Sequence, residues 1–127
     1  MPYSYDDQNI FAKILRGEIP NNTLLETEHC LAFRDIAPQR KEHVLVIPKG
    51  PYVSYDHFCK EASAEEMVDF NKAVASVVDQ LGISIDKGDG FRVVANTGEH
   101  GFQEVPHMHF HILGGEPVGA MLVKNGS

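Results

Sequence analysis

The sequence lacks any uninterrupted run of the roughly eighteen apolar residues that a membrane-spanning helix requires. Its first residues, Met1 to Asp7, are polar and acidic, unlike a signal peptide or a transit peptide. These two absences predict a cytoplasmic protein that has no membrane partner.

Cysteine is scarce, and acidic side chains outnumber basic ones. Cys30 and Cys59 lie far apart and form no C-x-x-C pair, which argues against a disulfide framework and against a cysteine zinc site. Lys and Arg total 11 against 18 Asp and Glu, and the formal net charge of −7 repels DNA and RNA polymers. A single small phosphate ligand remains compatible with this charge, because it responds to local donors more than to screened distant groups.

Internal repeats, low-complexity tracts and long linkers are absent as well. The chain has 127 residues, of which 43% are hydrophobic and 23% are charged, and this balance predicts one globular domain over residues 1–127. Pro117 and Gly119 indicate an irregular tail over residues 114–127.

Apolar residues at helical spacing indicate two helices. A short helix is expected over residues 9–16, and Gly17 stops it. A long helix should begin at Ser63, which forms a capping box with Glu66, and should end at Gly82. The apolar stripe along the long helix predicts that it packs against a sheet.

Five short strands are indicated by β-branched and alternating apolar residues. They are residues 23–26, 30–34, 43–47 and 91–96, and a last strand that runs from Val105 or His107 to Leu113. The third run is continuously apolar, which is typical of an inner strand buried on both faces. The pattern predicts an α+β fold with a mostly antiparallel five-stranded sheet, packed with one long and one short helix.

The last strand carries an H-x-H-x-H pattern. His107, His109 and His111 alternate with apolar residues, so their imidazoles share one face of the strand. Imidazole titrates near neutrality, so one ring could act as a nucleophile while its neighbours bind phosphate oxygens. The same row could ligate zinc, or it could be no more than a polar sheet face. The strand by itself leaves all three interpretations open.

The run from His107 to Leu113 resembles the signature of the histidine triad family, which is H-x-H-x-H followed by apolar residues. Further segments resemble the Hint (histidine triad nucleotide-binding) branch in the same order. They are residues 11–20 (FAKILRGEIP), 32–39 (AFRDIAPQ), 43–49 (HVLVIPK) and 113–115 (LGG). The similarity covers nearly the whole chain from Ile10, and the tail is similar to bacterial members.

This resemblance implies a homodimer whose sheet extends across the subunit interface. It also implies a hydrolase of purine nucleoside phosphoramidates, of the adenosine 5′-phosphoramidate type. His109 matches the nucleophile of the family, which forms a nucleotidyl-histidine that water then hydrolyses. His107 and His111 match the flanking members of the triad, and His43 matches a fourth histidine that supports the site. The resemblance implies no metal and no cofactor.

The resemblance also implies a binding site for a purine nucleotide. Asp35 matches a carboxylate that binds the ribose hydroxyls, which suits a bidentate acceptor. Asn96 and Gln103 match residues near the phosphate and the leaving group. Ile10, Phe11, Ile14, Ile19, Phe33 and Ile36 match the apolar walls around the base, and Arg34, Glu104 and Val105 complete the predicted nucleotide-binding residues. Without the resemblance, each of these would be interpreted as an ordinary core, turn or loop residue.

Three positions depart from patterns within the family. Glu104 stands where animal members carry a serine near the leaving group, although bacterial members also use Gly-Gln-Glu-Val. Gly101-Phe102-Gln103 stands where many members have Gly-Gly-Gln, so Phe102 adds bulk beside the phosphate loop. Pro106 replaces a usual aromatic residue and removes a backbone donor, which a strand tolerates best at its start or at an edge.

Other functions are compatible with the same residues. A dinucleoside polyphosphate hydrolase or a nucleotidyl transferase of the same superfamily would keep the histidine nucleophile and change the group that leaves or accepts. A nucleotide-binding interaction protein would use Asp35 and the apolar slot to hold AMP without significant turnover. Zinc bound by the triad is the third alternative.

Overall fold

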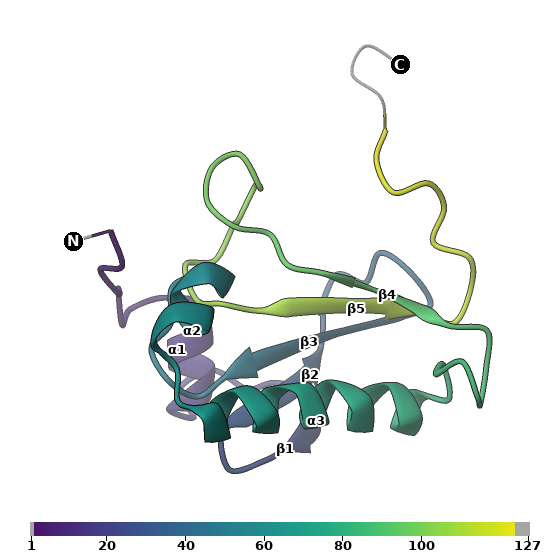
Figure 1. Cartoon of the computed structure of the whole chain (residues 1–127), viewed down its shortest axis with the longest axis horizontal. Helices are drawn as coiled ribbons and strands as arrows, with labels where there is room; N and C mark the ends of the chain where they lie inside the picture. The colour runs from purple at the N-terminus through teal and green to yellow at the C-terminus, as the bar shows by residue number, and fades with distance from the viewer. Residues whose placement is uncertain (1, 124–127) are drawn as a thin grey trace.

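The computed structural model describes residues 2–123, so Met1 and the end of the predicted tail, residues 124–127, lie outside the described part of the chain (Figure 1). Five strands form one sheet in the order β1-β2-β3-β5-β4, and every neighbouring pair is antiparallel. The strands are β1 (Thr23–Glu26), β2 (Cys30–Arg34), β3 (Glu42–Pro48), β4 (Phe91–Val94) and β5 (Phe110–Gly114), and the helices are α1 (Ile10–Leu15), α2 (Tyr55–Glu61) and α3 (Ala64–Leu81). The predicted α+β fold with an antiparallel five-stranded sheet is confirmed.

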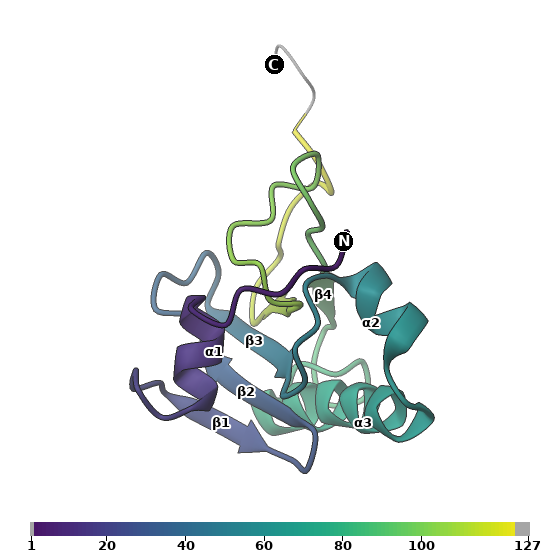
Figure 2. The ribbon, with the colours of Figure 1, turned by 90° about the vertical axis from the view of Figure 1, so that its left-hand side faces the viewer.

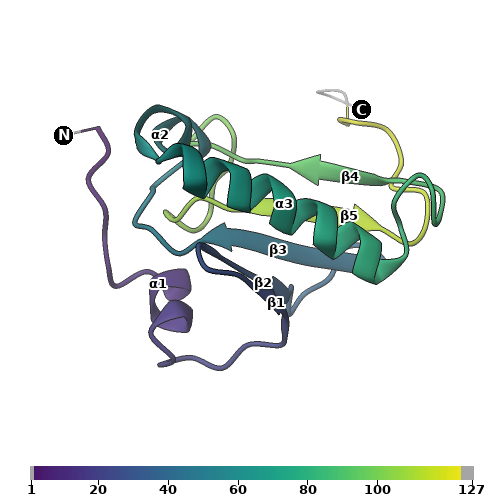
Figure 3. The ribbon, with the colours of Figure 1, turned by 60° about the horizontal axis from the view of Figure 1, so that its bottom comes forward.

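The central strand β3 is buried on both faces, as its continuous apolar run predicts. Val44 and Val46 belong to the core cluster under α3, while Leu45 and Ile47 belong to the cluster under α1. Figure 3 shows α3 lying along the sheet, and Figure 2 shows α1 on the opposite side. The sheet therefore has one face under the long helix and one face under the short helix.

Helix α3 begins where the capping box predicts. The Ser63 hydroxyl oxygen accepts from the Glu66 backbone N–H at 3.1 Å, and the Glu66 carboxylate accepts from the Ser63 backbone N–H at 3.0 Å. Gly82 ends the helix in the left-handed region at φ 70°, where glycine carries no Cβ penalty. Phe70, at 1% exposure, packs between the rings of Phe58 and Phe110. Burying one such ring contributes about 1.5–3 kcal/mol, so this contact anchors α3 on the sheet.

Helix α1 covers only part of the opposite face. Phe11 and Ile14 pack against Leu31 and Phe33 of β2. Because six residues span only about 9 Å, the helix is too short to cover the sheet from β1 to β5. The part of this face beside α1 stays open, and the candidate site lies there.

The structure contains a helix that the sequence pattern did not predict, so the expected count of one long and one short helix is wrong. The seven residues of α2 follow Ser54, whose side chain caps the helix by accepting from the His57 backbone N–H. So short a helix depends on tertiary contacts rather than on propensity, and here Phe58 supplies them through the core. Within residues 2–123, no helix combines the length and apolar character needed to cross a membrane.

Two predicted strands are shorter than expected. Strand β4 ends at Val94 rather than Asn96, and β5 begins at Phe110 rather than at Val105 or His107. The reason at β5 is that the Met108 N–H donates to the Tyr52 carbonyl at 2.8 Å and so does not pair with β3. Of the three triad histidines, His111 alone lies within β5.

Candidate active site

A cavity of about 700 Å³ opens beside α1 and brings together residues from both ends of the chain. It gathers two triad histidines and most of the predicted nucleotide-binding residues, which are Ile10, Phe11, Ile14, Ile19, Phe33, Arg34, Asp35, Ile36, Asn96, Glu104, Val105, His109 and His111. Its volume lies in the range that small ligands occupy in proteins. His43, His107 and Gln103 were also predicted as site residues, but they do not line the cavity.

The lining is apolar along the sheet and polar around the histidines. Most of the aliphatic and aromatic side chains come from helix α1, the segment after it and strands β2 and β3. Most of the polar groups come from the turn after β2, the segment between β4 and β5, and β5 itself. Ile36 lies at the mouth with 96% of its side chain exposed, and Arg34 is turned toward Glu42, with which it forms an ion pair of 2.9 Å. A mostly apolar slot with a few polar anchors is typical of small-molecule sites.

His109 is held in one tautomer. Its Nδ1 lies 2.7 Å from the backbone carbonyl oxygen of His107, which can only accept, so Nδ1 carries the proton. The edge of Phe11 contacts the ring, with the centroids 5.0 Å apart. Burial lowers the pKa of His109, so the ring is neutral at pH 7. Since Nδ1 is protonated, Nε2 has a free lone pair.

His111 is held in the opposite tautomer by a second pair of contacts. The backbone N–H of Gln39 donates to His43 Nδ1 at 3.1 Å, so the neutral His43 carries its proton on Nε2. His43 Nε2 lies 2.9 Å from His111 Nδ1, which therefore accepts and leaves the His111 proton on Nε2. Burial lowers the pKa of His111 to about 4 and also lowers the pKa of His43. His111 thus presents an N–H donor beside the lone pair of His109.

His107 lies behind the site instead of in it. Its ring is fully buried, its Nε2–H donates to the Pro48 carbonyl at 2.8 Å, and its Nδ1 lies 2.7 Å from the Tyr5 hydroxyl. Burial lowers the pKa of His107 to about 4. Since both ring nitrogens are occupied by protein groups, His107 cannot bind a ligand in the cavity. The expectation that both flanking rings contact phosphate oxygens is corrected, and that contact is left to His111.

The protonation pattern also bears on the zinc alternative. The three triad rings cannot converge on one metal, because both ring nitrogens of His107 are taken, one by the Pro48 carbonyl and one by the Tyr5 hydroxyl. Asp35, His43 and His111 do bring ligand atoms within 4.8 Å of one another. However, the 2.9 Å between the two imidazole nitrogens is shorter than the roughly 3.3 Å that two ligands of a tetrahedral zinc require. This cluster has the geometry of a hydrogen-bonded relay and not of a zinc site.

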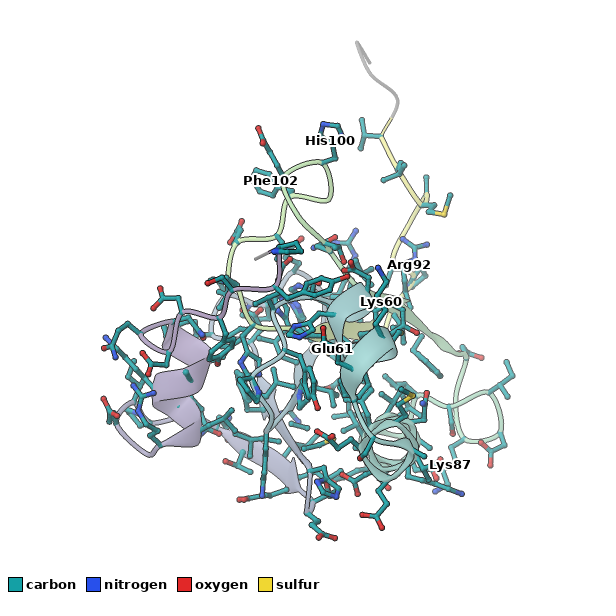
Figure 4. The ribbon with its side chains drawn as sticks, turned by 60° about the vertical axis from the view of Figure 1, so that its left-hand side comes forward. Lys60, Glu61, Lys87, Arg92, His100 and Phe102 are labelled. Atoms are coloured by element: carbon teal, nitrogen blue, oxygen red, sulfur yellow. The ribbon has the colours of Figure 1, made fainter. Side chains whose placement is uncertain are left out.

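The Gln103 side chain stabilises the loop that precedes the triad through hydrogen bonds to the backbone. Its side-chain oxygen accepts from the Gly98 N–H, and its amide nitrogen donates to the carbonyls of Val53 and Val105. Phe102 next to it has φ 58°, the left-handed conformation that explains why glycine is usual at this position. Figure 4 shows Phe102 and His100 on this protruding loop, and Phe102 also lines the cavity mouth.

Several functional residues were not identified from the sequence. Asn21, Gln39 and Leu45 line the cavity, and Gln39 also sets the tautomer of His43. Gln39 lies within a segment that resembles the family, so its position in that segment was an available signal. Tyr5 gave no signal, because a tyrosine in a polar N-terminal segment has no pattern that connects it with a histidine 102 positions later.

Because the site histidines are buried and neutral, acid should destabilise the folded protein. The pKa values of His107 and His111 lie at about 4, whereas unfolded histidine titrates near 6.5. Between these values the unfolded chain binds more protons, so the stability is complete above pH 6.5 and is lost as the pH falls toward 4. We expect the free energy of unfolding, measured in urea, to fall between pH 6.5 and 5.5 by about 1 kcal/mol from His107, with a smaller further loss from the less buried His111.

The exposed His100 provides the control for this titration. Since the side chain of His100 is exposed and the substitution leaves His107 and His111 in place, His100→Ala should still lose stability as the pH falls. A free energy of unfolding that stays constant from pH 7 to 5.5 would contradict the buried, neutral state of the two rings.

Comparison with known proteins connects this geometry to a family. The family model described as the HIT domain matches residues 16–118. A HIT-like protein of Azospirillum brasilense is 47% identical over 124 residues, which cover 98% of this chain and 99% of that protein. The purine nucleoside phosphoramidase of Escherichia coli K12 is 38% identical over 123 residues, covering 94% and 98%. The solved structure of a histidine triad protein from Clostridium difficile matches with a TM-score of 0.77 and 33% identity, covering 92% and 98%.

Proposed function

This chain belongs to the HIT domain family, and on that basis we propose that it is a purine nucleoside phosphoramidase, a hydrolase of phosphorus–nitrogen bonds. The observation that carries the proposal is the state of His109. Its Nδ1–H donates to the His107 carbonyl, so a neutral ring directs the free lone pair of Nε2 to the substrate in a cavity of nucleotide size. A neutral imidazole nitrogen is a competent nucleophile.

In the first step, His109 Nε2 forms a bond to phosphorus and the phosphorus–nitrogen bond of the substrate breaks. The departing nitrogen takes up a proton from water and leaves as an amine. The ring acquires positive charge, which the Nδ1–H···O=C bond to His107 stabilises. The Nε2–H of His111 is the available donor for a phosphoryl oxygen, and so it stabilises the negative charge there.

In the second step, water attacks the phosphorus of the nucleotidyl-histidine and the bond to Nε2 breaks. The proton that this water loses returns to the solvent, which supplied the proton of the amine in the first step. The products are the nucleoside monophosphate and neutral His109, so the sum is hydrolysis of the phosphoramidate to a nucleotide and an amine. Apart from water, the groups that take part in these two steps are side chains and a backbone carbonyl of the chain. In this proposal His43 acts on His111, and His107 acts on His109, without contact with the substrate.

The nucleoside part of the proposal rests on the lining of the cavity. Asp35 offers a carboxylate at the cavity wall, which matches two vicinal hydroxyl donors of a ribose. The aliphatic and aromatic residues of α1 and β2 offer a flat apolar slot for a base. The similar protein of Escherichia coli is named for purine nucleosides, and this supports the assignment of a purine here.

We also propose the homodimer that the resemblance implies, with the sheet continuing through β4. Strand β4 lies at the edge of the sheet, and its Phe91 and Val93 side chains are 42% and 37% exposed. An exposed edge with apolar side chains is a template for pairing with a second strand. Pairing of two β4 strands would extend the sheet through both subunits.

The test of the proposed reaction is a substrate panel on wild-type protein that contains no metal. We expect a fluorogenic adenosine 5′-phosphoramidate to be cleaved with a kcat/KM at least about tenfold above that of a diadenosine polyphosphate, because Glu104 and Asp35 repel an anionic leaving group more than a neutral amine. Preferred cleavage of the dinucleotide would instead indicate the polyphosphate hydrolase. AMP binding without turnover of either substrate would indicate an interaction protein.

A further inference from the structure

The segment before α1 crosses the open end of the sheet toward α2 (Figure 2). Tyr3 attaches it to that helix, since its ring stacks on His57 with the centroids 4.4 Å apart and the planes 4° apart. The Tyr3 hydroxyl donates to the Asp56 carboxylate at 2.8 Å and accepts from Lys60 Nζ at 3.0 Å. Figure 4 shows Lys60 on α2. These contacts hold the segment before α1 against α2.

Tyr5, in the same segment, contacts the triad itself. Its hydroxyl oxygen lies 2.7 Å from Nδ1 of His107, and the two rings meet edge to face with centroids 5.6 Å apart. His107 Nε2 faces the Pro48 carbonyl, which only accepts, so Nε2 carries the proton and Nδ1 is the acceptor. The Tyr5 hydroxyl therefore donates. It satisfies an acceptor on a ring with 0% exposure, where water does not reach.

His107 connects the Tyr5 hydroxyl with the ring of His109. The backbone carbonyl of His107 accepts from His109 Nδ1–H at 2.7 Å. The direction of that carbonyl depends on the position of His107. Two hydrogen bonds of its ring, to the Pro48 carbonyl and to the Tyr5 hydroxyl, fix this position. Removing the Tyr5 hydroxyl would leave a buried acceptor without its donor, and His107 would have to shift or reverse its tautomer.

We propose that Tyr5 is a positioning residue, which holds His107 so that its carbonyl keeps the Nε2 lone pair of His109 aimed into the cavity. The inference rests on the proposed function, because it assigns Tyr5 to the same reaction. Tyr5 does not line the cavity. It acts on the nucleophile through one ring and one carbonyl, and a substrate does not touch it.

The test compares Tyr5→Phe with Tyr3→Phe, two variants that each remove one hydroxyl from the same segment. Tyr5→Phe should lower kcat on the adenosine phosphoramidate by about tenfold or more, the size of effect that partners of a functional histidine have. Its KM and its affinity for AMP should stay within about twofold of wild type, because the cavity lining is unchanged. Tyr3→Phe keeps its stacking on His57 and has no contact with the triad, so its kcat should match wild type.

A spectroscopic measurement separates positioning from loss of structure. In the ¹⁵N spectrum of the imidazoles, the Nδ1 resonances of His107 and His109 should both move in Tyr5→Phe and should both stay in place in Tyr3→Phe. A kcat of Tyr5→Phe equal to wild type would overturn the proposal. An equal loss of kcat and of AMP affinity in both variants would also overturn it. That result would mean that each hydroxyl only attaches the N-terminal segment to the rest of the protein.

Failure of the proposed function would give a different result. The wild-type protein would then release no amine from any phosphoramidate, and no variant could be compared by rate. The imidazole resonances would still decide the inference about Tyr5: joint movement of the His107 and His109 signals in Tyr5→Phe supports it, and unchanged signals overturn it.

Discussion

Replacing His109 with alanine should lower kcat for hydrolysis of an adenosine phosphoramidate by about four orders of magnitude or more, as the loss of a catalytic nucleophile does in other hydrolases. The reason lies in the hydrogen-bond pattern of the site. Of the two triad rings in the cavity, His109 alone directs a lone pair into it, since His43 keeps the proton of His111 on Nε2. His111 therefore cannot replace the nucleophile that the substitution removes.

Binding of AMP is the internal control for this variant. His109 is one residue in a wall that also contains Asp35 and Phe33, so the Kd for AMP, measured by calorimetry, should change by no more than about tenfold. His100→Ala, on the exposed loop in Figure 4, should keep the wild-type kcat. Equal rates of amine release by wild type and His109→Ala would remove His109 from the mechanism, and with it the nucleotidyl-histidine.

The second large effect is expected at Asp35. Replacing Asp35 with alanine should lower kcat/KM for the adenosine phosphoramidate by about a hundredfold, because a site that hydrogen-bonds a substrate hydroxyl discriminates strongly against its loss. Alanine is a cleaner substitution than asparagine. The Asp35 carboxylate lies 3.4 Å from His43 Nε2, which carries a proton, and the amide of an asparagine could place a donor against that donor.

A substrate without ribose hydroxyls completes the test of Asp35. The 2′,3′-dideoxy phosphoramidate should be a poor substrate for wild type, also by about a hundredfold, and Asp35→Ala should cause little further loss on it. Asp35 has a second role, because its carboxylate also accepts from the Ala37 N–H at 2.8 Å in the turn after β2. If the variant lost the same factor on both substrates, the role of Asp35 would be this turn and not the ribose.

The elements with a strong local pattern were predictable. The Ser63–Glu66 capping box and the apolar stripe defined α3 to the residue, and the continuous apolar run of β3 indicated a central strand. Helix α2 was not predictable, because its seven residues are stabilised by packing of Phe58 into a core that other segments build. The start of β5 was misplaced for the same kind of reason, since the Tyr52 carbonyl draws the Met108 N–H away from the sheet.

The sequence by itself determined which side chains share a face. Alternation places His107, His109 and His111 on the side of the sheet opposite α3, and any strand-like backbone with these residues would do so. The sequence also contains the segments that resemble the family, and these segments indicated most of the residues that line the cavity. Periodicity is a local property of the chain, and so it can be recognised in the sequence without the tertiary structure.

Only the tertiary structure decided which nitrogen of each histidine carries a proton. Three chemically identical rings differ in what their nitrogens offer: His109 has a free Nε2 lone pair, His111 has an Nε2–H donor, and His107 has both nitrogens bound by the protein. Their partners are the His107 carbonyl for His109, His43 with Gln39 for His111, and Pro48 with Tyr5 for His107. Apart from the His107 carbonyl, these partners lie far from the triad in the chain, and a tautomer depends on the direction of one N–H or one carbonyl. That direction exists only after folding has brought the segments together.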